Sequence, residues 1–273
     1  MREITSRHNA LVSEYRAVAR RRPPHATSVL LEGARLVEEA LQAGIPLRSA
    51  AVSRSLLHQP AIEELAGRLH RIGADITVVT EAVMRAMSPA PSPSGLVALA
   101  DVEPAGLDRA FAGARQLVLI LFDVQDPGNA GAIIRSAEAL HATAVVFCGA
   151  SVDPFGWKAL RGAMGSAFRL PVVSRTDGSA AVAAARAAAL SVIAAVPAGG
   201  RDVTESDLTR PLACLLGGEG PGLDPSVVAA ADQTVSIPMA RPVESLNVAV
   251  AAAILSWEAH RQRALQRSAG RHA

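Results

Sequence analysis

The stretch Ser236-Ile-Pro-Met-Ala-Arg-Pro-Val-Glu-Ser-Leu-Asn247 decides how the second half of this chain is organised. Residues 235–239 are typical of the end of a buried strand, and the two prolines prevent further pairing because proline has no backbone N–H. Ser245 is a suitable N-cap for the apolar helix that follows, which places Asn247 in its first turn. Free N–H groups and the positive end of the helix dipole favour a polar ligand there. The stretch therefore predicts a binding loop, although an ordinary capped helix would give the same pattern.

A second polar loop, Asp126-Pro-Gly-Asn129, opens a predicted helix. Residues 133, 134, 137 and 140 form one apolar face of this helix, and Arg135 points the other way. Its neighbours one turn away, Gly131 and Ala139, are small and leave room for a substrate beside the guanidinium. The alternative is a solvated arginine on an amphipathic helix.

The third loop, Gly217-Gly-Glu-Gly-Pro-Gly-Leu223, follows an apolar run and carries Glu219 as its one charge. Glycines permit positive φ and let the backbone approach a ligand closely. A dinucleotide-binding loop is disfavoured, because no acidic ribose partner follows about 20 residues later. A plain glycine-rich turn is the other alternative.

Alternation of apolar runs with helical patterns predicts an α/β fold in which these three loops converge. Residues 117–124 form an unbroken apolar run, as in a parallel strand covered on both faces. Ligands bind beyond the carboxyl ends of strands in such sheets. Further strands are expected at residues 144–148, 171–173, 191–196 and 212–216, with helices at about 180–190 and 245–266.

The first hundred residues show the same alternation on a smaller scale. Strands are expected near residues 29–32, 49–53, 76–79 and 96–100, with helices between them. A cluster of proline and serine at residues 88–95 indicates a passage between domains, extending to about residue 107. We therefore expect two domains, residues 1–100 and 101–273.

Composition permits a nucleic-acid partner without requiring one. The chain has 273 residues, a net charge of +2 and a pI near 8.9. Lys158 is its only lysine, so the basic charge rests on arginine, which suits bidentate phosphate contacts. Arg20, Arg21 and Arg22 end a predicted helix and either contact phosphate or complement the helix dipole. Genome composition is the other cause of an arginine bias, and it is the one we favour.

Cysteine usage and hydropathy suggest a cytoplasmic protein. Cys148 and Cys214 lie in apolar runs without a CxxC motif or neighbouring histidines, which predicts reduced core thiols and no metal site. No apolar run approaches the roughly 20 residues that span a bilayer, and the N-terminus lacks an apolar export segment. We expect no membrane partner.

In their order along the chain, the three loops resemble the motifs of the SpoU (TrmH) branch of the SPOUT RNA methyltransferases. The matching features are Asn129 with Arg135, the Gly-Gly-Glu-Gly-Pro-Gly loop, and Ile-Pro-Met followed by Glu-Ser-Leu-Asn. The resemblance spans residues 117–265. The first domain resembles, less specifically, the ribosomal-protein-like substrate-binding domain of rRNA-modifying members. One departure is His141, at a predicted helix end where the family often has glycine.

This resemblance implies methyl transfer from S-adenosylmethionine to a ribose 2′-hydroxyl of RNA. It also implies a SPOUT-type parallel sheet with a C-terminal deep trefoil knot, plus a smaller N-terminal α/β domain, and a homodimer whose active sites use groups from both subunits. The N-terminal domain favours 23S rRNA over tRNA as substrate. A tRNA 2′-O-methyltransferase and a non-catalytic RNA-binding protein with the same fold are the alternatives.

The resemblance also implies the site residues. The expected catalytic residues are Asn129, Arg135, Glu219, Ser245 and Asn247. The expected cofactor-binding residues are Val196, Leu216, Gly217, Gly218, Gly220, Ile237, Met239, Ser245 and Leu246. A ribose hydroxyl must lose its proton as the methyl group arrives. The family favours the arginine for this step, whereas a guanidinium is almost always protonated and better suited to clamping a phosphate, so the identity of the base stays open.

Residues 151–169 contain Phe155, Trp157, Lys158, Arg161 and Arg169. A basic stretch with interleaved aromatic side chains suits an RNA-facing surface. Packing of the two aromatic side chains in a core is the alternative.

Overall fold

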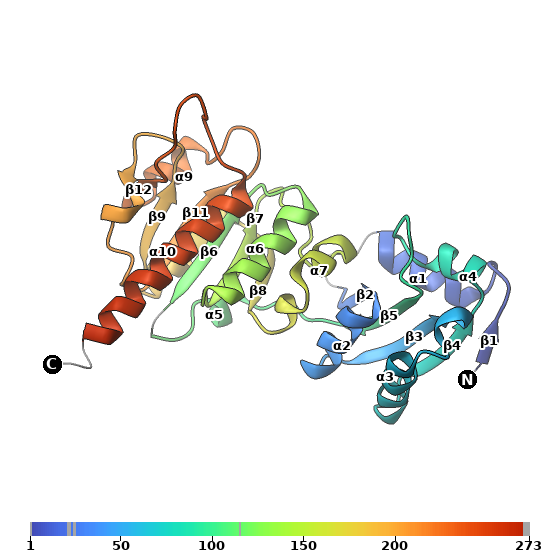
Figure 1. Cartoon of the computed structure of the whole chain (residues 1–273). Helices are drawn as coiled ribbons and strands as arrows, with labels where there is room; N and C mark the ends of the chain where they lie inside the picture. Colours follow the sequence, from blue (N-terminus) through green and yellow to red (C-terminus); the bar gives the residue numbers. More distant parts are fainter. Residues whose placement is uncertain (1, 21–22, 24–25, 115, 270–273) are drawn as a thin grey trace. The chain divides into compact units, whose positions relative to one another are not determined.

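The structure, a computed structural model, describes residues 2–20, 23, 26–114 and 116–269 in two compact units (Figure 1). One unit comprises residues 1–103 together with 155–169, and the other comprises residues 104–154 and 170–273. The return of residues 155–169 to the first unit was not expected from the sequence. The functional division at residue 100 stays a prediction.

The first unit is built on a five-stranded sheet in the order β1-β4-β3-β5-β2. Strand β5 runs antiparallel to both of its neighbours, and the other pairs are parallel. The predicted small α/β domain is therefore present, with a mixed sheet. Its strands are β1 (Arg2–Ile4), β2 (Ser28–Glu32), β3 (Leu47–Ser53), β4 (Asp75–Val79) and β5 (Leu96–Asp101). Its helices are α1 (Ala10–Arg20), α2 (Ala34–Gln42), η1 (Arg54–Leu56), α3 (Pro60–Arg71), α4 (Glu81–Met87), α7 (Trp157–Ala163) and η2 (Ser166–Phe168).

Helix α7 belongs to the first unit because its residues pack on the core of that unit. It lies against β2, and Trp157 packs on the cluster around Tyr15 and Met84. Phe155 is buried, and Arg169 pairs with Glu39 at 2.6 Å. Core packing, one of the two alternatives for these aromatic side chains, is confirmed. Arg21 and Arg22, predicted to extend the basic end of α1, lie outside the described residues.

The second unit contains a seven-stranded sheet in the order β10-β12-β9-β11-β6-β7-β8, and every strand pair in it is parallel. Its strands are β6 (Leu117–Phe122), β7 (Ala144–Cys148), β8 (Val172–Thr176), β9 (Ser191–Ala195), β10 (Arg201–Asp202), β11 (Leu212–Gly217) and β12 (Gln233–Ser236). Its helices are α5 (Leu107–Ala110), α6 (Pro127–Ala139), α8 (Gly178–Ala187), η3 (Val203–Glu205), α9 (Pro225–Ala229) and α10 (Val248–Ala269).

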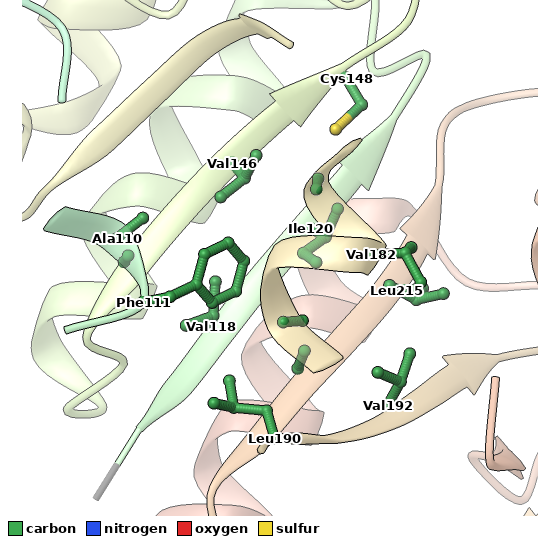
Figure 2. Close-up of a cluster of buried hydrophobic side chains, with 14 of the residues drawn as sticks. Ala110, Phe111, Val118, Ile120, Val146, Cys148, Val182, Leu190, Val192 and Leu215 are labelled. Atoms are coloured by element: carbon green, nitrogen blue, oxygen red, sulfur yellow. The ribbon is translucent and has the colours of Figure 1, made fainter. Parts of the chain in front are cut away.

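Helices cover both faces of this sheet, as the unbroken apolar run predicted. All six residues of β6 are buried. On one face, Val118 and Ile120 pack with Phe111 after α5 and Val182 of α8 (Figure 2). Helices α6 and α10 lie side by side on the other face (Figure 1). The central strands are therefore dry on both sides, which leaves their ends for polar chemistry.

The loop at residues 236–247 differs from its prediction in two respects. Strand β12 ends at Ser236, so the strand predicted at residues 235–239 is wrong beyond that point. Helix α10 begins at Val248, and the Asn247 side chain accepts hydrogen bonds from the N–H groups of Ala249 at 2.9 Å and Val250 at 3.4 Å. The N-cap is therefore Asn247 rather than Ser245, which lies in the loop. Asparagine caps as well as serine does, so the sequence could not separate the two.

Both cysteines are free and buried, as predicted. Across the described residues, no helix is long and apolar enough to cross a membrane. Within the same part of the chain, no group of three or more His, Cys, Asp or Glu side chains is placed to hold a metal ion.

Candidate active site

A pocket of about 390 Å³ lies beyond the carboxyl ends of β9, β11 and β12, within the second unit. Two of the predicted loops line it, together with the chain after β9. All nine residues expected to bind the cofactor are among its lining residues: Val196, Leu216, Gly217, Gly218, Gly220, Ile237, Met239, Ser245 and Leu246. The sheet thus brings together segments that lie up to 50 residues apart in the chain.

Glycine is required in the 217–223 loop because backbone packs against backbone there. A Cβ atom at Gly217 would overlap the backbone of Gly222 and Leu223, and one at Gly218 would overlap the carbonyl of Asp123. The Gly218 N–H donates to the Phe122 carbonyl at 2.6 Å, which joins the loop to the end of β6. Gly222 has a positive φ of 75°. The loop therefore presents backbone groups, rather than side chains, to the pocket.

The other side of the pocket is apolar. Val248, Ala251 and Leu255 of α10 line it at helical spacing, and Val228 of α9 adds to it. We did not predict these four residues as part of the site. Intervals of 3 and 4 residues separate Val248, Ala251 and Leu255, which places them on one face of the helix. This spacing was the feature of the sequence from which they could have been predicted. Ser236 fixes the loop that follows β9, because its hydroxyl donates to the Val196 carbonyl at 3.0 Å.

A polar network closes the mouth of the pocket. The Asn129 amide donates to the Glu219 carboxylate, and the Asn129 oxygen accepts from the Asn247 amide at 3.0 Å. Asp126 caps α6, because its carboxylate accepts a hydrogen bond from the Asn129 N–H at 2.8 Å. This bond holds the backbone of Asn129 in place and so positions its side chain. Glu219, Ser245 and Asn247 line the pocket, and Asn129 connects two of them. Four of the five expected catalytic residues therefore lie at one place.

Arg135 is the exception, since it neither lines the pocket nor, like Asn129, bonds to a residue that does. It lies six residues beyond Asn129 on α6, which is about 9 Å along the helix and about 120° around it. The side chain is exposed, and it has no hydrogen bond or ion pair with any other described residue. Within one chain, the structure does not bring Arg135 to the other candidate residues.

Comparison with known proteins identifies the family of this chain. Residues 116–257, just over half of the chain, match the model of the SpoU rRNA Methylase family. The chain belongs to the SpoU rRNA methylase family. Residues 9–98 match the MRM3-like substrate binding domain, so the resemblance seen in the first domain is confirmed as well. As a SpoU enzyme, the chain transfers a methyl group from S-adenosylmethionine to a ribose 2′-hydroxyl of RNA.

Relatives of this SpoU protein match it along nearly its whole length. The 23S rRNA (guanosine(2553)-2′-O)-methyltransferase RlmP of Bacillus subtilis is 31% identical over 94% of this chain and 98% of its own. The 23S rRNA (uridine(2479)-2′-O)-methyltransferase of Streptomyces viridochromogenes is 33% identical over 98% and 95%. The crystal structure of the SpoU methyltransferase AviRb of S. viridochromogenes in complex with AdoMet matches with a TM-score of 0.85 at 30% identity, covering 94% of this chain and 99% of AviRb.

The pocket of the SpoU protein fits S-adenosylmethionine in size and in the chemistry of its walls. Its volume falls within the range of about 300 to 1000 Å³ usual for small-molecule sites. Leu216, Ile237 and Leu255 offer apolar contact for an adenine ring, and the close-packed glycines offer backbone donors and acceptors for polar groups. The cofactor supplies a methyl group on a positively charged sulfur, which is already activated for transfer.

Proposed function

We propose that this SpoU enzyme methylates a ribose 2′-hydroxyl of 23S rRNA. The support is that two relatives covering more than nine tenths of the chain are named for 23S rRNA, and that both halves of the chain match, including the substrate-binding domain. In addition, Asn129, Glu219 and Asn247 form a hydrogen-bonded group at the mouth of a pocket that suits the methyl donor.

At this mouth, the chain has to orient the ribose and help its hydroxyl lose a proton. Glu219 accepts from the Asn129 amide, which fixes the amide oxygen toward Asn247 and the loop edge. The three side chains thereby form a rigid acceptor and donor array next to the pocket. We assign this array the role of holding the ribose in line with the methyl donor, since positioning of this kind contributes several kcal/mol to catalysis.

Arg135 would act from the other subunit of a homodimer. Its exposure and its distance from the pocket mouth on its own chain both support this assignment. A guanidinium is a strong bidentate donor, so Arg135 would clamp a phosphate next to the target ribose. The proton acceptor is then either a substrate phosphate or one of the oxygens at the pocket mouth.

Helix α10 supports a dimer because it carries exposed large apolar side chains on one side. Val250, Trp257 and Leu265 are 46%, 53% and 58% exposed and follow each other at intervals of 7 and 8 residues. Such spacing keeps them on one face of a helix. Large apolar side chains exposed along one face of a helix favour a protein interface.

Mixed dimers test the contribution of Arg135. Arg135→Ala and Gly218→Ala proteins are mixed and allowed to exchange subunits, and they are assayed at an S-adenosylmethionine concentration too low to fill the Gly218→Ala pocket, so that each protein alone is nearly inactive. If Arg135 serves the partner's pocket, one site of each mixed dimer has an intact pocket and an intact arginine, so about a quarter of the wild-type sites recover in a two-fold dimer. Absence of recovery, with mixed dimers verified by mass spectrometry, places Arg135 on its own subunit's site or outside the reaction.

The trefoil knot that the resemblance implies is part of the proposal. Its support is that β12 lies next to the sheet edge, whereas α10, eleven residues later, packs against central β6 and β11. The connecting residues 237–247 line the same pocket as the 195–197 and 217–223 segments. A crystal structure in which residues 237–269 pass outside the loop after β9 would contradict the knot.

Ribosomal RNA from cells lacking the gene tests the substrate. Purified protein and labelled S-adenosylmethionine should methylate one nucleotide of that 23S rRNA, and Asn129→Ala protein should lose most of this activity. Methyl transfer confined to tRNA would make the chain a tRNA enzyme. RNA binding without any transfer would make it a non-catalytic binding protein.

A further inference from the structure

A second pocket, of about 290 Å³, lies at the opposite end of the sheet from the first. It is formed where α6 ends and the second half of α10 passes the start of β6. Its lining residues are Leu117, Leu140, His141, Thr209, His260, Arg263, Gln266 and Arg267. None of these residues lines the first pocket. The methyl-transfer chemistry described above makes no use of this place.

The walls of the second pocket are basic. Two histidines and two arginines make up half of its lining residues, and none of the eight is an aspartate or a glutamate. The Arg263 guanidinium is held in place by the backbone carbonyls of Gln116, Leu208 and Arg210, at 2.7 to 3.1 Å. A fixed cation in a hollow without a carboxylate wall attracts an anion.

Two neighbouring carboxylates, Asp207 and Glu258, are already bound to other partners. Asp207 accepts from the Thr209 hydroxyl and pairs with Arg210 at 3.2 Å. Glu258, on α10, accepts from Arg261 and Gln262 at 2.7 and 2.8 Å. Neither of these two acids therefore neutralises the pocket.

The two histidine rings face each other across the pocket wall. Their centroids are 4.8 Å apart, and their planes differ by 18°. His141 reaches this position because it follows the last turn of α6 in the left-handed conformation, at a φ of 61°. Burial, together with the nearby His141 and Arg267, lowers the pKa of His260 below its ordinary value. An anion beside the two rings would therefore favour a proton on His260.

We propose that this pocket is a binding site for a phosphate group, in which His141, His260 and Arg267 contact the anion and His260 takes up a proton as the anion binds. Arg263, whose guanidinium is held by backbone carbonyls, adds a fixed positive charge to the pocket wall. The phosphate is either part of the RNA backbone or a free phosphate such as inorganic phosphate or pyrophosphate. The chemistry of recognition is the same for both sources.

Proton uptake gives the site a signature that a general basic surface lacks. His141 and Arg267 both disfavour the protonated form of His260, and an anion beside them offsets this effect. Binding should therefore strengthen as pH falls. Sulfate is the suitable probe for this dependence, because its own charge does not change between pH 6 and pH 8.

Histidine resonances in the full-length protein provide the direct test. Pyrophosphate or sulfate at about 10 mM, enough to fill a site of millimolar Kd, should shift the ring signals of His141 and His260 and leave exposed His70 unchanged. Sulfate should bind at least about threefold more tightly at pH 6 than at pH 8. Unshifted His141 and His260 signals, together with RNA affinity that is unchanged in the variants below, would overturn the proposal.

RNA affinity identifies the source of the phosphate. His260→Gln and Arg267→Gln should weaken RNA binding and reduce its dependence on log salt by about 0.7 for each lost contact, if the RNA backbone fills the pocket. Arg109→Gln, an exposed arginine of the same unit outside both pockets, is the matched control. Shifts with pyrophosphate but unchanged RNA affinity assign the site to free phosphate. Affinity for S-adenosylmethionine and sedimentation verify that each variant is folded and keeps its oligomeric state.

Discussion

Asn247 performs two tasks with one side chain. Its oxygen caps α10 by accepting from the N–H groups of Ala249 and Val250, and its amide nitrogen donates to Asn129 at the pocket mouth. The start of α10 and the catalytic array are thereby held in register. This coupling explains why asparagine, rather than serine or aspartate, suits the position.

Two substitutions separate these tasks. Asn247→Ala removes both and should lower the free energy of unfolding by about 1 kcal/mol, the usual effect of losing an N-cap. Asn247→Asp keeps the cap but cannot donate to Asn129, so its stability should be close to wild type while methyl transfer falls on the order of 100-fold. Urea denaturation and single-turnover assays measure the two quantities. An Asp variant with full activity would remove the Asn129 contact from the mechanism.

The resemblance implied the residues that line the pocket, and the parallel strand ends explain why these residues meet. Once β9, β11 and β12 are parallel neighbours, the residues after each strand must meet at one edge, and Val196, Gly217 and Ile237 do so. Arg135 could not be placed in the same way. The place of a residue in a helix fixes only the direction in which its side chain leaves the helix axis. On α6 this direction points Arg135 away from the pocket mouth.

At the level of elements, the 217–223 loop depends on glycine at positions where main chain meets main chain. Gly218→Ala should displace the loop, because its Cβ would overlap the Asp123 carbonyl. We expect affinity for S-adenosylmethionine to fall at least about tenfold, a loss of 1.4 kcal/mol or more. Calorimetry measures this affinity, and thermal unfolding shows whether the rest of the chain is intact.

Gly67→Ala is the matched control for this loop. Gly67 lies inside α3, where an added methyl group meets only the tip of Arg71 at 3.9 Å. Alanine favours a helix over glycine, so this variant should be as stable as wild type or more stable by up to about 1 kcal/mol. Unchanged cofactor affinity in Gly218→Ala would show that the loop tolerates a side chain and does not shape the pocket.

Long helices and the strands of five or more residues were predicted, whereas short helices were not. The unbroken run at β6 and the pattern of α10 led to correct assignments. Helices α4, α7 and α9, of 7, 7 and 5 residues, were missed because each has too few turns to show a period. Nothing in the pattern of α7 shows that Trp157 packs on the cluster around Tyr15 and Met84, because contacts between residues so far apart in the chain depend on the whole fold.

For the molecule as a whole, the buried thiols predict a dependence of stability on pH. Burial raises the pKa of Cys214 and, together with Asp177 and Asp123, that of Cys148, each to about 12. The unfolded thiols ionise near the ordinary pKa of a cysteine, 9.0. The stability that follows from keeping them neutral is therefore complete below about pH 9 and is lost as pH rises toward 12.

Urea denaturation between pH 8 and 10 tests this dependence. The free energy of unfolding should fall above about pH 9, with each thiol contributing at most about 1.4 kcal/mol per pH unit. Cys214→Ala should remove its share of that slope, after allowance for the small cavity it leaves. A slope that is identical in wild type and Cys214→Ala would contradict the burial of this thiol.

Residues 155–169 fold with the first unit although they lie between β7 and β8 of the second, so the chain passes between the units three times. Neither unit can therefore be excised by a single cut. A 104–273 fragment should unfold at lower temperature than the full chain or aggregate, because Trp157 and the buried face of α7 lose their partners. A recognition module borrowed from a relative could give this enzyme a new target. Such an exchange must replace two separate pieces of the gene together, the one that encodes residues 1–103 and the one that encodes residues 155–169.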